Sequence, residues 1–434
     1  MAQLAHINYE DAPFLPVHKK ITLGVYLGQI SDGYTLCVVG TALTLATTHL
    51  GLTSFWMGAI GAGALLGILF GSLCLGPLSD RFGRKPLFIL SMLLFSIVTA
   101  IQFFISDPLT LVATRFLIGA CIGMDYTSSP SLLTEWVPRR LSPRLLGSFL
   151  ILWMTGFVFA YFIGIAMPDF GENTWRWILV SPLLPSSLAF LWRLCSGIPE
   201  SPRWLASKGR TEEGQELIRK HLGPEYYMTA NLETGAVSTS WFQLFSKDQW
   251  RASLTAGIFY ATQVFPFFGI GIFLPMVLAD MNMAGQLAPG IIYNLFMIIG
   301  VLVGVWLIEK ISRRTFLLTT FYASALLMSI IALWQGMPTN LLIVMLTLFS
   351  FILNIGIVLE NPYPAELFPT HLRASGVGFA TAVSRIGAAA GTFLLPVINE
   401  QCGIYVTLGG CAVSLWLGGI VCQAWAPETS QKFK

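Results

Sequence analysis

The chain has 434 residues, of which 55% are hydrophobic and only 11% are charged, and its mean hydropathy is +0.70. Soluble domains carry about a quarter charged residues, so a soluble globule of this size could not cover its surface with so few. The composition excludes most cytosolic enzymes, nucleic-acid-binding proteins and disordered proteins. A net charge of +3 is too small to indicate a polyanionic partner.

Apolar segments recur along the whole chain. A helix needs roughly 20 such residues to cross a bilayer, and no segment alternates with period two as a barrel strand would. We therefore predict an all-α polytopic membrane protein with twelve transmembrane helices, over residues 21–47, 54–77, 87–106, 109–133, 145–167, 177–198, 252–279, 289–309, 315–336, 340–361, 375–399 and 403–425.

The basic residues predict the orientation. With both termini in the cytoplasm, 22 of the 25 Lys and Arg, Arg193 among them, fall on the cytoplasmic side. Arg176 lies in an outer loop, and Arg115 and Arg385 lie within spans. Residues 1–20 are polar, which argues against a cleaved signal peptide. Short outer loops without a glycosylation sequon favour a multi-pass protein of a bacterial inner membrane.

The chain divides into two related parts. The longest stretch that is not apolar separates a six-helix bundle over 1–198 from another over 252–434, and residues 199–251 form a cytoplasmic linker with a short helix. Charged motifs repeat between the halves at offsets of 228 to 231 residues: Gly83-Arg84-Lys85-Pro86 with Ser312-Arg313-Arg314-Thr315, Glu135 with Glu366, Arg144 with Arg373, and Pro199-Glu200-Ser201 with Pro427-Glu428-Thr429. Duplicated halves with a site between them suit alternating access.

Several loops carry a family resemblance. Gly76-Pro-Leu-Ser-Asp80-Arg81-Phe-Gly83-Arg84-Lys85 resembles the signature loop of the major facilitator superfamily. Pro199-Glu200-Ser201-Pro202-Arg203-Trp204-Leu205, the terminal Pro427-Glu428-Thr429 and the segment from Pro364 to Gly376 resemble the sugar-porter branch. The resemblance covers essentially the whole chain. It implies two pseudo-symmetric six-helix bundles around a central cavity.

Charged groups at the cytoplasmic helix ends form a predicted latch. Arg–carboxylate pairs are bidentate and directional, so they can hold the inward side closed and break when it opens. Plain positive-inside anchoring remains the alternative for the basic members. The latch residues are Asp80, Arg84, Glu135, Arg144, Glu200, Arg203, Glu366 and Arg373.

Intramembrane charges predict proton coupling, because each is costly unless it is paired or hydrated. Asp32 of the first span and Arg115 of the fourth lie at similar depths, and the sugar-porter resemblance implies that such residues form a pair. Asp32 is the expected proton carrier and Arg115 its gate, with a static ion pair as the alternative. Asp125 is expected to be a second proton site or a cavity wall, with a hydrogen-bonded acid near the inner interface as the alternative.

The expected substrate pocket departs from that of a hexose carrier. Glu360-Asn361 stands where sugar porters commonly have a Trp, and the seventh span has one amide, Gln263, beside aromatic residues. An arginine with aromatic neighbours fits an organic or aromatic acid, although a cation fits if Arg385 points away. The pocket residues are Arg385, Glu360, Asn361, Gln263, Phe267, Asn294, Asn354 and Tyr126.

The sequence therefore predicts a secondary transporter and not an enzyme. The expected function is proton-coupled uptake of an organic acid or a sugar-like metabolite. An efflux antiporter, an organic-cation carrier and a receptor with a transporter fold are the alternatives. Cys and His residues show no metal spacing and no phosphate-binding loop occurs, so neither a metal nor a cofactor is expected. The expected partners are the solute, protons and lipid, with no nucleic acid, and the expected state is a monomer.

Overall fold

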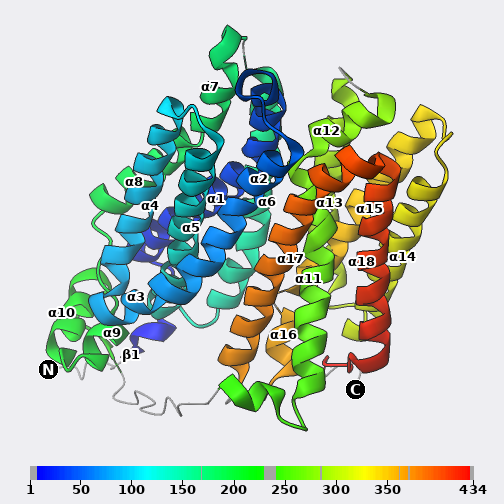
Figure 1. Ribbon diagram of the computed structural model, residues 1–434. Coiled ribbons are helices and arrows are strands. Elements are labelled where there is room, and N and C mark those ends of the chain that lie inside the picture. Colours follow the sequence, from blue (N-terminus) through cyan, green and yellow to red (C-terminus); the bar gives the residue numbers. More distant parts are fainter. Residues whose placement is uncertain are drawn as a thin grey trace, which may run out of the picture.

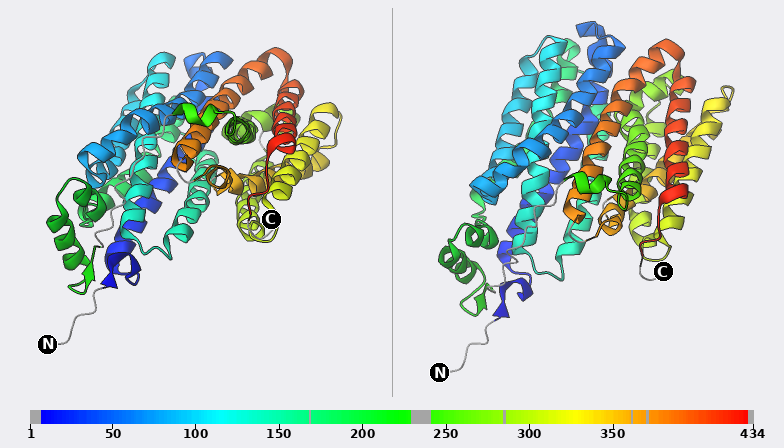
Figure 2. Two further views of the ribbon diagram at one scale, coloured as in Figure 1. Left: turned by 90° about the horizontal axis from the view of Figure 1, so that it is seen from below. Right: turned by 60° about the horizontal axis from the view of Figure 1, so that its bottom comes forward.

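The computed structural model describes residues 7–167, 169–228, 241–283, 286–360, 362–369 and 372–430. Long helices dominate these ranges and stand side by side in two groups (Figures 1 and 2). Both ends of the chain lie at the same end of the molecule (Figure 1). We call this end, where Arg84, Arg203 and Arg313 lie, the basic end, and the other the opposite end.

The N-terminal half begins with the longest helix of the described residues. Its helices are α1 (Pro16–Leu50), α2 (Ser54–Phe70), α3 (Gly76–Phe82), α4 (Arg84–Ile101), α5 (Pro108–Trp136), α6 (Ser142–Ala166), α7 (Thr174–Val180) and α8 (Leu183–Cys195). A π-helical turn over Gly71–Leu75 joins α2 to α3, and Ser181 and Pro182 separate α7 from α8.

The C-terminal half repeats this plan. Its helices are α11 (Trp250–Ile272), α12 (Leu274–Leu278), α13 (Leu287–Leu307), α14 (Arg313–Leu333), α15 (Thr339–Ile357), α16 (Pro362–Leu367), α17 (Arg373–Cys402) and α18 (Ile404–Trp425). Buried apolar side chains of both halves join into one continuous core.

Twelve segments of the described chain cross a membrane. Eleven of them are long and apolar enough by composition alone. The twelfth, α1, has 35 residues, and a rise of 1.5 Å per residue makes it about 50 Å long. Its charged residues Lys19, Lys20 and Asp32 lower its hydropathy. The predicted fold class, a twelve-helix membrane protein of two six-helix halves, is confirmed.

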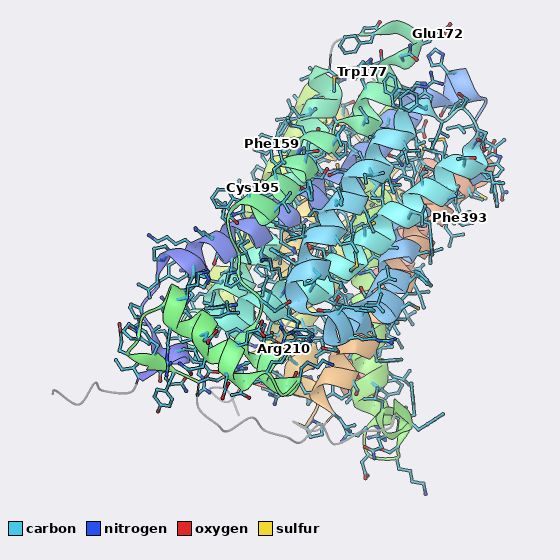
Figure 3. All side chains as sticks on the ribbon, turned by 90° about the vertical axis from the view of Figure 1, so that its left-hand side faces the viewer. Phe159, Glu172, Trp177, Cys195, Arg210 and Phe393 are labelled. Atoms are coloured by element: carbon cyan, nitrogen blue, oxygen red, sulfur yellow. The ribbon has the colours of Figure 1, made fainter. Side chains whose placement is uncertain are left out.

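The linker after α8 folds against the basic end of the N-terminal half. It contains α9 (Pro202–Ser207), α10 (Thr211–His221) and β2 (Tyr226–Tyr227), and β2 pairs in parallel with β1 (Ile7–Asn8). Tyr9, Trp136, Ile218 and Tyr226 share a second buried cluster. Figure 3 shows Arg210 of this linker at the basic end and Glu172 at the opposite end.

The two halves touch closely toward the opposite end. A Cβ atom on Gly40 of α1 would lie 1.6 Å from the carbonyl oxygen of Ile272 in α11. A Cβ atom on Gly58 of α2 would lie 2.4 Å from the carbonyl oxygen of Phe393 in α17. Only glycine allows these backbones to approach so closely. The helices of the two halves therefore seal against each other near this end.

Candidate functional site

A charged cluster joins α4, α5 and the linker at the basic end of the N-terminal half. The Arg84 guanidinium lies 2.5 Å from the Asp80 carboxylate and 3.4 Å from that of Glu135. Glu200 accepts hydrogen bonds from the backbone N–H groups of Arg84, Lys85 and Ser201. Burial raises the pKa of Glu200, and these hydrogen bonds only partly offset the effect.

The C-terminal half contains the equivalent cluster. The Arg313 guanidinium lies 3.4 Å from the Glu366 carboxylate, which also accepts a hydrogen bond from Thr429. Glu428 accepts hydrogen bonds from the backbone N–H groups of Arg313 and Arg314. Partial burial raises the pKa of Glu428, but hydrogen bonds from Arg314, Ser430 and Arg313 outweigh it, so the net pKa is lowered. The repeat seen in the sequence is thus a repeat of contacts.

Those predicted latch residues that form ion pairs do so within their own halves. Arg203 does not join the Arg84 cluster: it forms an ion pair with Glu10, which also pairs with Arg139. Arg144 and Arg373 are exposed, and neither forms an ion pair among the described residues. No ion pair recorded in the described ranges crosses between the halves. These pairs therefore do not close the basic end in this conformation.

Asp32 is buried in the interior of α1. Its side chain is 0% exposed, and neither carboxylate oxygen has a hydrogen-bond partner among the described residues. Arg115 is equally buried and donates a hydrogen bond of 2.9 Å to the Thr35 carbonyl oxygen, about one turn further along α1. The expected ion pair between Asp32 and Arg115 is therefore not formed in this structure, although both side chains face α1–α5 packing rather than lipid.

The sequence analysis missed the principal intramembrane ion pair. Arg193 of α8 and Asp125 of α5 are both 0% exposed, and the guanidinium lies 2.5 Å from the carboxylate. Arg193 was counted with the cytoplasmic basic residues, but its side chain is buried within the helix bundle. It lies near the end of an apolar segment, so a sequence pattern alone places it at the membrane edge. Three helices enclose the guanidinium: Gly24 of α1 and Phe88 of α4 accept its hydrogen bonds, and Asp125 of α5 forms the ion pair.

Polar side chains of both halves meet near the middle of the molecule. The Arg385 guanidinium of α17 lies 5.9 Å from the ring centre of Tyr126 in α5. Arg385 is also within electrostatic range of Glu360, which has Tyr260 of α11 beside it. One buried Glu360 oxygen and the buried Nε of Arg385 lack hydrogen-bond partners among the described residues. These unpartnered groups are available to a solute or to water.

The amides and the aromatic residues of the predicted pocket divide between those with unpartnered polar atoms and those that bond or pack within the protein. Gln263 and Asn354 are buried and each has an oxygen without a partner in the described ranges, whereas Asn294 donates to the Gly290 carbonyl oxygen. Phe267 packs against Trp153 of α6, which the sequence analysis did not select. Asn361 lies outside the described residues.

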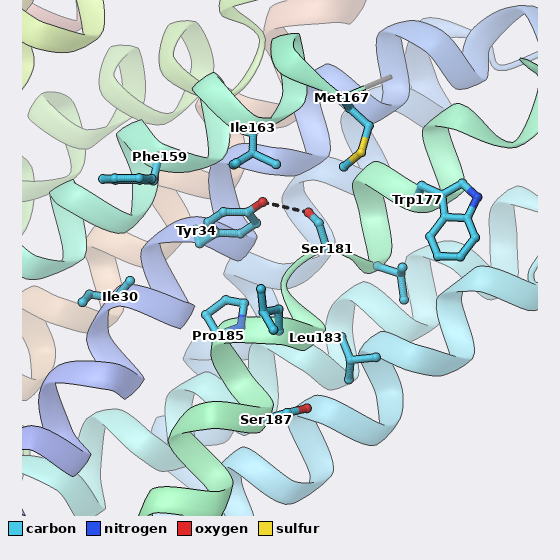
Figure 4. Close-up of a pocket in the computed structure, with 12 residues that line it drawn as sticks. Ile30, Tyr34, Phe159, Ile163, Met167, Trp177, Ser181, Leu183, Pro185 and Ser187 are labelled. Carbon is cyan, nitrogen blue, oxygen red and sulfur yellow. Dashed lines mark hydrogen bonds between the residues drawn. The ribbon is translucent and has the colours of Figure 1, made fainter. Parts of the chain in front are cut away.

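A separate apolar groove lies between α1, α6, α7 and α8. Its volume is about 720 Å³, and Tyr34 and Ser181 join across it through a hydrogen bond of 2.9 Å (Figure 4). Phe159, Trp177 and Leu184 line it and are exposed apolar side chains. The groove therefore faces the surroundings of the helices, and it contains none of the residues predicted for solute or proton binding.

Comparison with known proteins assigns the family. Residues 21–433 match the family model described as sugar (and other) transporter. The chain is 37% identical to the inner membrane metabolite transport protein YgcS of Escherichia coli over 98% of its length and 94% of that protein. It is 29% identical to the niacin transporter NiaP of Acinetobacter baylyi over 88% of this chain and 87% of NiaP. It is 28% identical to the arabinose-proton symporter of Bacillus subtilis over 97% and 96%.

The fold agrees with this assignment. The xylose transporter XylE of E. coli in an inward open conformation superposes with a TM-score of 0.78 at 19% identity, over 96% of this chain and 98% of XylE. The protein is a multi-pass membrane transporter and not an enzyme. The chain belongs to the sugar (and other) transporter family, within the major facilitator superfamily.

Proposed function

We propose that this protein is a proton-coupled importer of a small organic solute, working by alternating access in a bacterial inner membrane. The observation that carries the proposal is the buried Asp32 carboxyl, which has no hydrogen-bond partner among the described residues. An unpaired acid is costly inside a membrane unless it exchanges a proton or meets a partner in another state. The names of YgcS and the arabinose-proton symporter support metabolite transport and proton coupling.

The solute binds, in this proposal, where Arg385, Glu360 and Tyr126 meet. A guanidinium with an unpartnered Nε suits a carboxylate, because charge-assisted hydrogen bonds are about twice as strong as neutral ones. Gln263 and Asn354 offer unpartnered oxygens to hydroxyl or amine groups. An organic acid fits this set better than a hexose, which needs many partners for its hydroxyls. NiaP, named for niacin, supports the same substrate class.

The conformation described here is inward-facing in this proposal. Both chain ends and the repeated charge clusters lie at the basic end, which the positive-inside rule assigns to the cytoplasm. The close contacts at Gly40 and Gly58 seal the opposite end, while the latch residues pair only within each half. The solute therefore leaves toward the basic end. The single chain contains both bundles, so a monomer suffices.

Coupling follows from the position of Asp32. When Asp32 is protonated it is neutral and needs no charged partner, so the protein can adopt the closed intermediate conformation. When Asp32 is ionised it requires a guanidinium. Arg115 of α5 contacts α1 at Thr35, about one turn from Asp32, and its Nε and Nη1 are unpartnered among the described residues. Proton release would then draw the Asp32 carboxylate to a guanidinium and change how the neighbouring helices pack on α1. We propose that this exchange links the proton to the conformational cycle.

Transport in proteoliposomes tests the proposal. Purified protein is offered aromatic acids, hydroxy acids, sugars and amines with and without an inward proton gradient. We expect accumulation of an acid that depends on the gradient and alkalinises the outside medium. Accumulation driven only by an outward proton flux would identify an efflux antiporter instead. Gradient-independent equilibration of every solute tested would contradict proton coupling.

A further inference from the structure

The ion pair between Arg193 and Asp125 is built into the N-terminal half through many bonds. Arg193 donates to the carbonyl oxygens of Gly24, at 3.0 Å, and Phe88, at 2.6 Å, and its guanidinium lies 3.8 Å from the Phe88 ring centre. Asp125 accepts hydrogen bonds of 3.0 Å from Ser91 and 2.9 Å from Ser129. Asp125 would therefore keep two hydrogen bonds if Arg193 moved.

A glycine in α1, the helix that carries Asp32, lets this ion pair pack directly against the α1 backbone. A Cβ atom on Gly28 would lie 2.1 Å from Nη2 of Arg193 and 3.0 Å from Oδ2 of Asp125, so a larger residue there would displace the guanidinium. Asp32 lies four residues further along α1, which is about 6 Å along the helix axis and on the same face. The carboxyl of Asp32 is therefore one turn from the guanidinium of Arg193.

Asp32 has a guanidinium on each side along α1. Arg193 lies one turn toward the basic end, and Arg115 lies about one turn toward the opposite end, on the Thr35 carbonyl. From α5, Cys121, Asp125 and Tyr126 also lie within electrostatic range of Asp32. Nη2 of Arg193 holds Oδ2 of Asp125 at 3.2 Å, the longer contact of the pair. This is the contact that the guanidinium can exchange.

We propose that Arg193 is the counter-ion of Asp32 on the cytoplasmic side, and that Asp125 is the positioning residue that holds Arg193 beside it. This inference rests on the proposed function. Asp32 gives its proton to water, and its new carboxylate takes Nη2 of Arg193 from Oδ2 of Asp125. Arg193 stays a guanidinium throughout and keeps its bonds to Gly24 and Phe88. Rebinding a proton on Asp32 returns Nη2 to Asp125.

The pH dependence of uptake tests this role with three variants. Asp125→Asn leaves the Arg193 charge uncompensated, which favours ionised Asp32, so the pH of half-maximal uptake should fall by about one unit or more. Arg193→Gln leaves the Asp125 charge uncompensated, and the same midpoint should rise. The double variant is neutral at both positions, so its midpoint should return to within about half a unit of the wild-type value.

Solute counterflow separates this role from a structural one. Counterflow exchanges solute across the membrane without net proton movement, so variants that fold should retain it within about threefold while their pH midpoints move. Arg193→Lys keeps the charge and should keep the midpoint. Arg210→Gln, on the exposed linker, controls for loss of a basic residue. If Arg193→Gln cannot be purified, Asp125→Asn and Arg193→Lys decide the question alone.

The outcomes distinguish this inference from the proposed function. Wild-type protein that shows no proton-driven uptake contradicts the function itself. Proton-driven uptake that Asp32→Asn abolishes, with the Asp125 and Arg193 single variants keeping the wild-type midpoint, contradicts only the counter-ion role. Single variants whose midpoints shift in the same direction also contradict it, because a charge effect must change sign between removing an acid and removing a base.

Discussion

The two halves of the molecule agree at the basic end and differ inside the membrane. At the basic end, Arg84 with Glu135 and Glu200 has the same contacts as Arg313 with Glu366 and Glu428. Inside, the N-terminal half holds a fully hydrogen-bonded pair, Asp125 with Arg193, whereas Arg385 and Glu360 of the C-terminal half keep unpartnered atoms.

In the proposed mechanism, this difference corresponds to separate roles for the two halves. The contacts that occur in both halves hold the helix ends in position, and both bundles need this. The interior of the N-terminal half groups the charges that suit a proton, and the interior of the C-terminal half presents polar atoms that suit a solute. Duplication thus supplied one scaffold twice, and the interior side chains distinguish the halves.

Replacing Arg385, the intramembrane arginine of the C-terminal half, should have the largest effect on solute affinity. Arg385→Gln should reduce solute affinity roughly 10-fold to 100-fold, because a hydrogen bond to a charged group is worth about 1.5–3 kcal/mol. Binding to purified protein, by calorimetry or thermal shift, measures it. Arg373→Gln is the matched control, because Arg373 is an exposed arginine of the same helix. Equal affinity in the two variants would remove Arg385 from the site.

A methyl group at the contact between halves should shift the conformational equilibrium. Gly40→Ala places a Cβ atom 1.6 Å from the Ile272 carbonyl oxygen, so sealing of the opposite end should become less favourable by about 1–3 kcal/mol. The distance between one spin label on α2 and one on α17, both placed at the opposite end of the molecule, should lengthen. Gly147→Ala is the control, because a Cβ atom there meets nothing within 4 Å. Unchanged distances in Gly40→Ala would contradict the sealing role.

The repeated clusters should differ modestly in strength. Glu135 is 15% exposed and Glu366 is 31% exposed, so solvent screens the second pair more. Glu135→Gln should therefore lower the melting temperature of the purified protein more than Glu366→Gln. We expect a difference equivalent to about 1 kcal/mol or less. A larger loss in Glu366→Gln would show that burial does not rank these pairs.

Glu200 and Glu428 should respond to pH in opposite directions, with the smallest effect of the series. The raised pKa of Glu200 means that its protonation favours the folded state, so its contribution to stability falls as pH rises through 4.5 and above. The lowered pKa of Glu428 means that its contribution is present above 4.5 and lost as pH falls below that value. Melting curves of Glu200→Gln and Glu428→Gln between pH 4 and 7 should deviate from wild type with opposite slopes.

Much of the fold was predictable because the membrane imposes its own pattern. Span length and the distribution of basic residues predicted twelve helices, and the repeated motifs predicted two related halves. The helix α1 was the exception, because its charged residues lower its hydropathy, although its 35 residues are long enough to span a membrane. The repeated loop motifs also placed Arg84, Glu135 and Glu366 together at the cytoplasmic helix ends, but they did not predict the contact of Arg313 with Glu366.

The site was less predictable, because pairing inside the membrane depends on helix rotation and length. Similar depth and the family resemblance matched Asp32 to Arg115, but the Arg115 side chain donates to the Thr35 carbonyl oxygen instead. Arg193 lies near a predicted membrane edge in the sequence, and the packing of α1, α4 and α5 around α8 buries it. Gly28 is the sequence feature that could have indicated this contact, because a glycine one turn before a buried acid leaves room for a guanidinium.

Proton-driven uptake by Asp32→Asn in proteoliposomes tests the central claim most directly. The asparagine keeps the shape of the side chain but cannot carry a proton. We predict that accumulation above equilibrium disappears in this variant while counterflow persists. Accumulation by Asp32→Asn that still follows the proton gradient at the wild-type level would contradict the account.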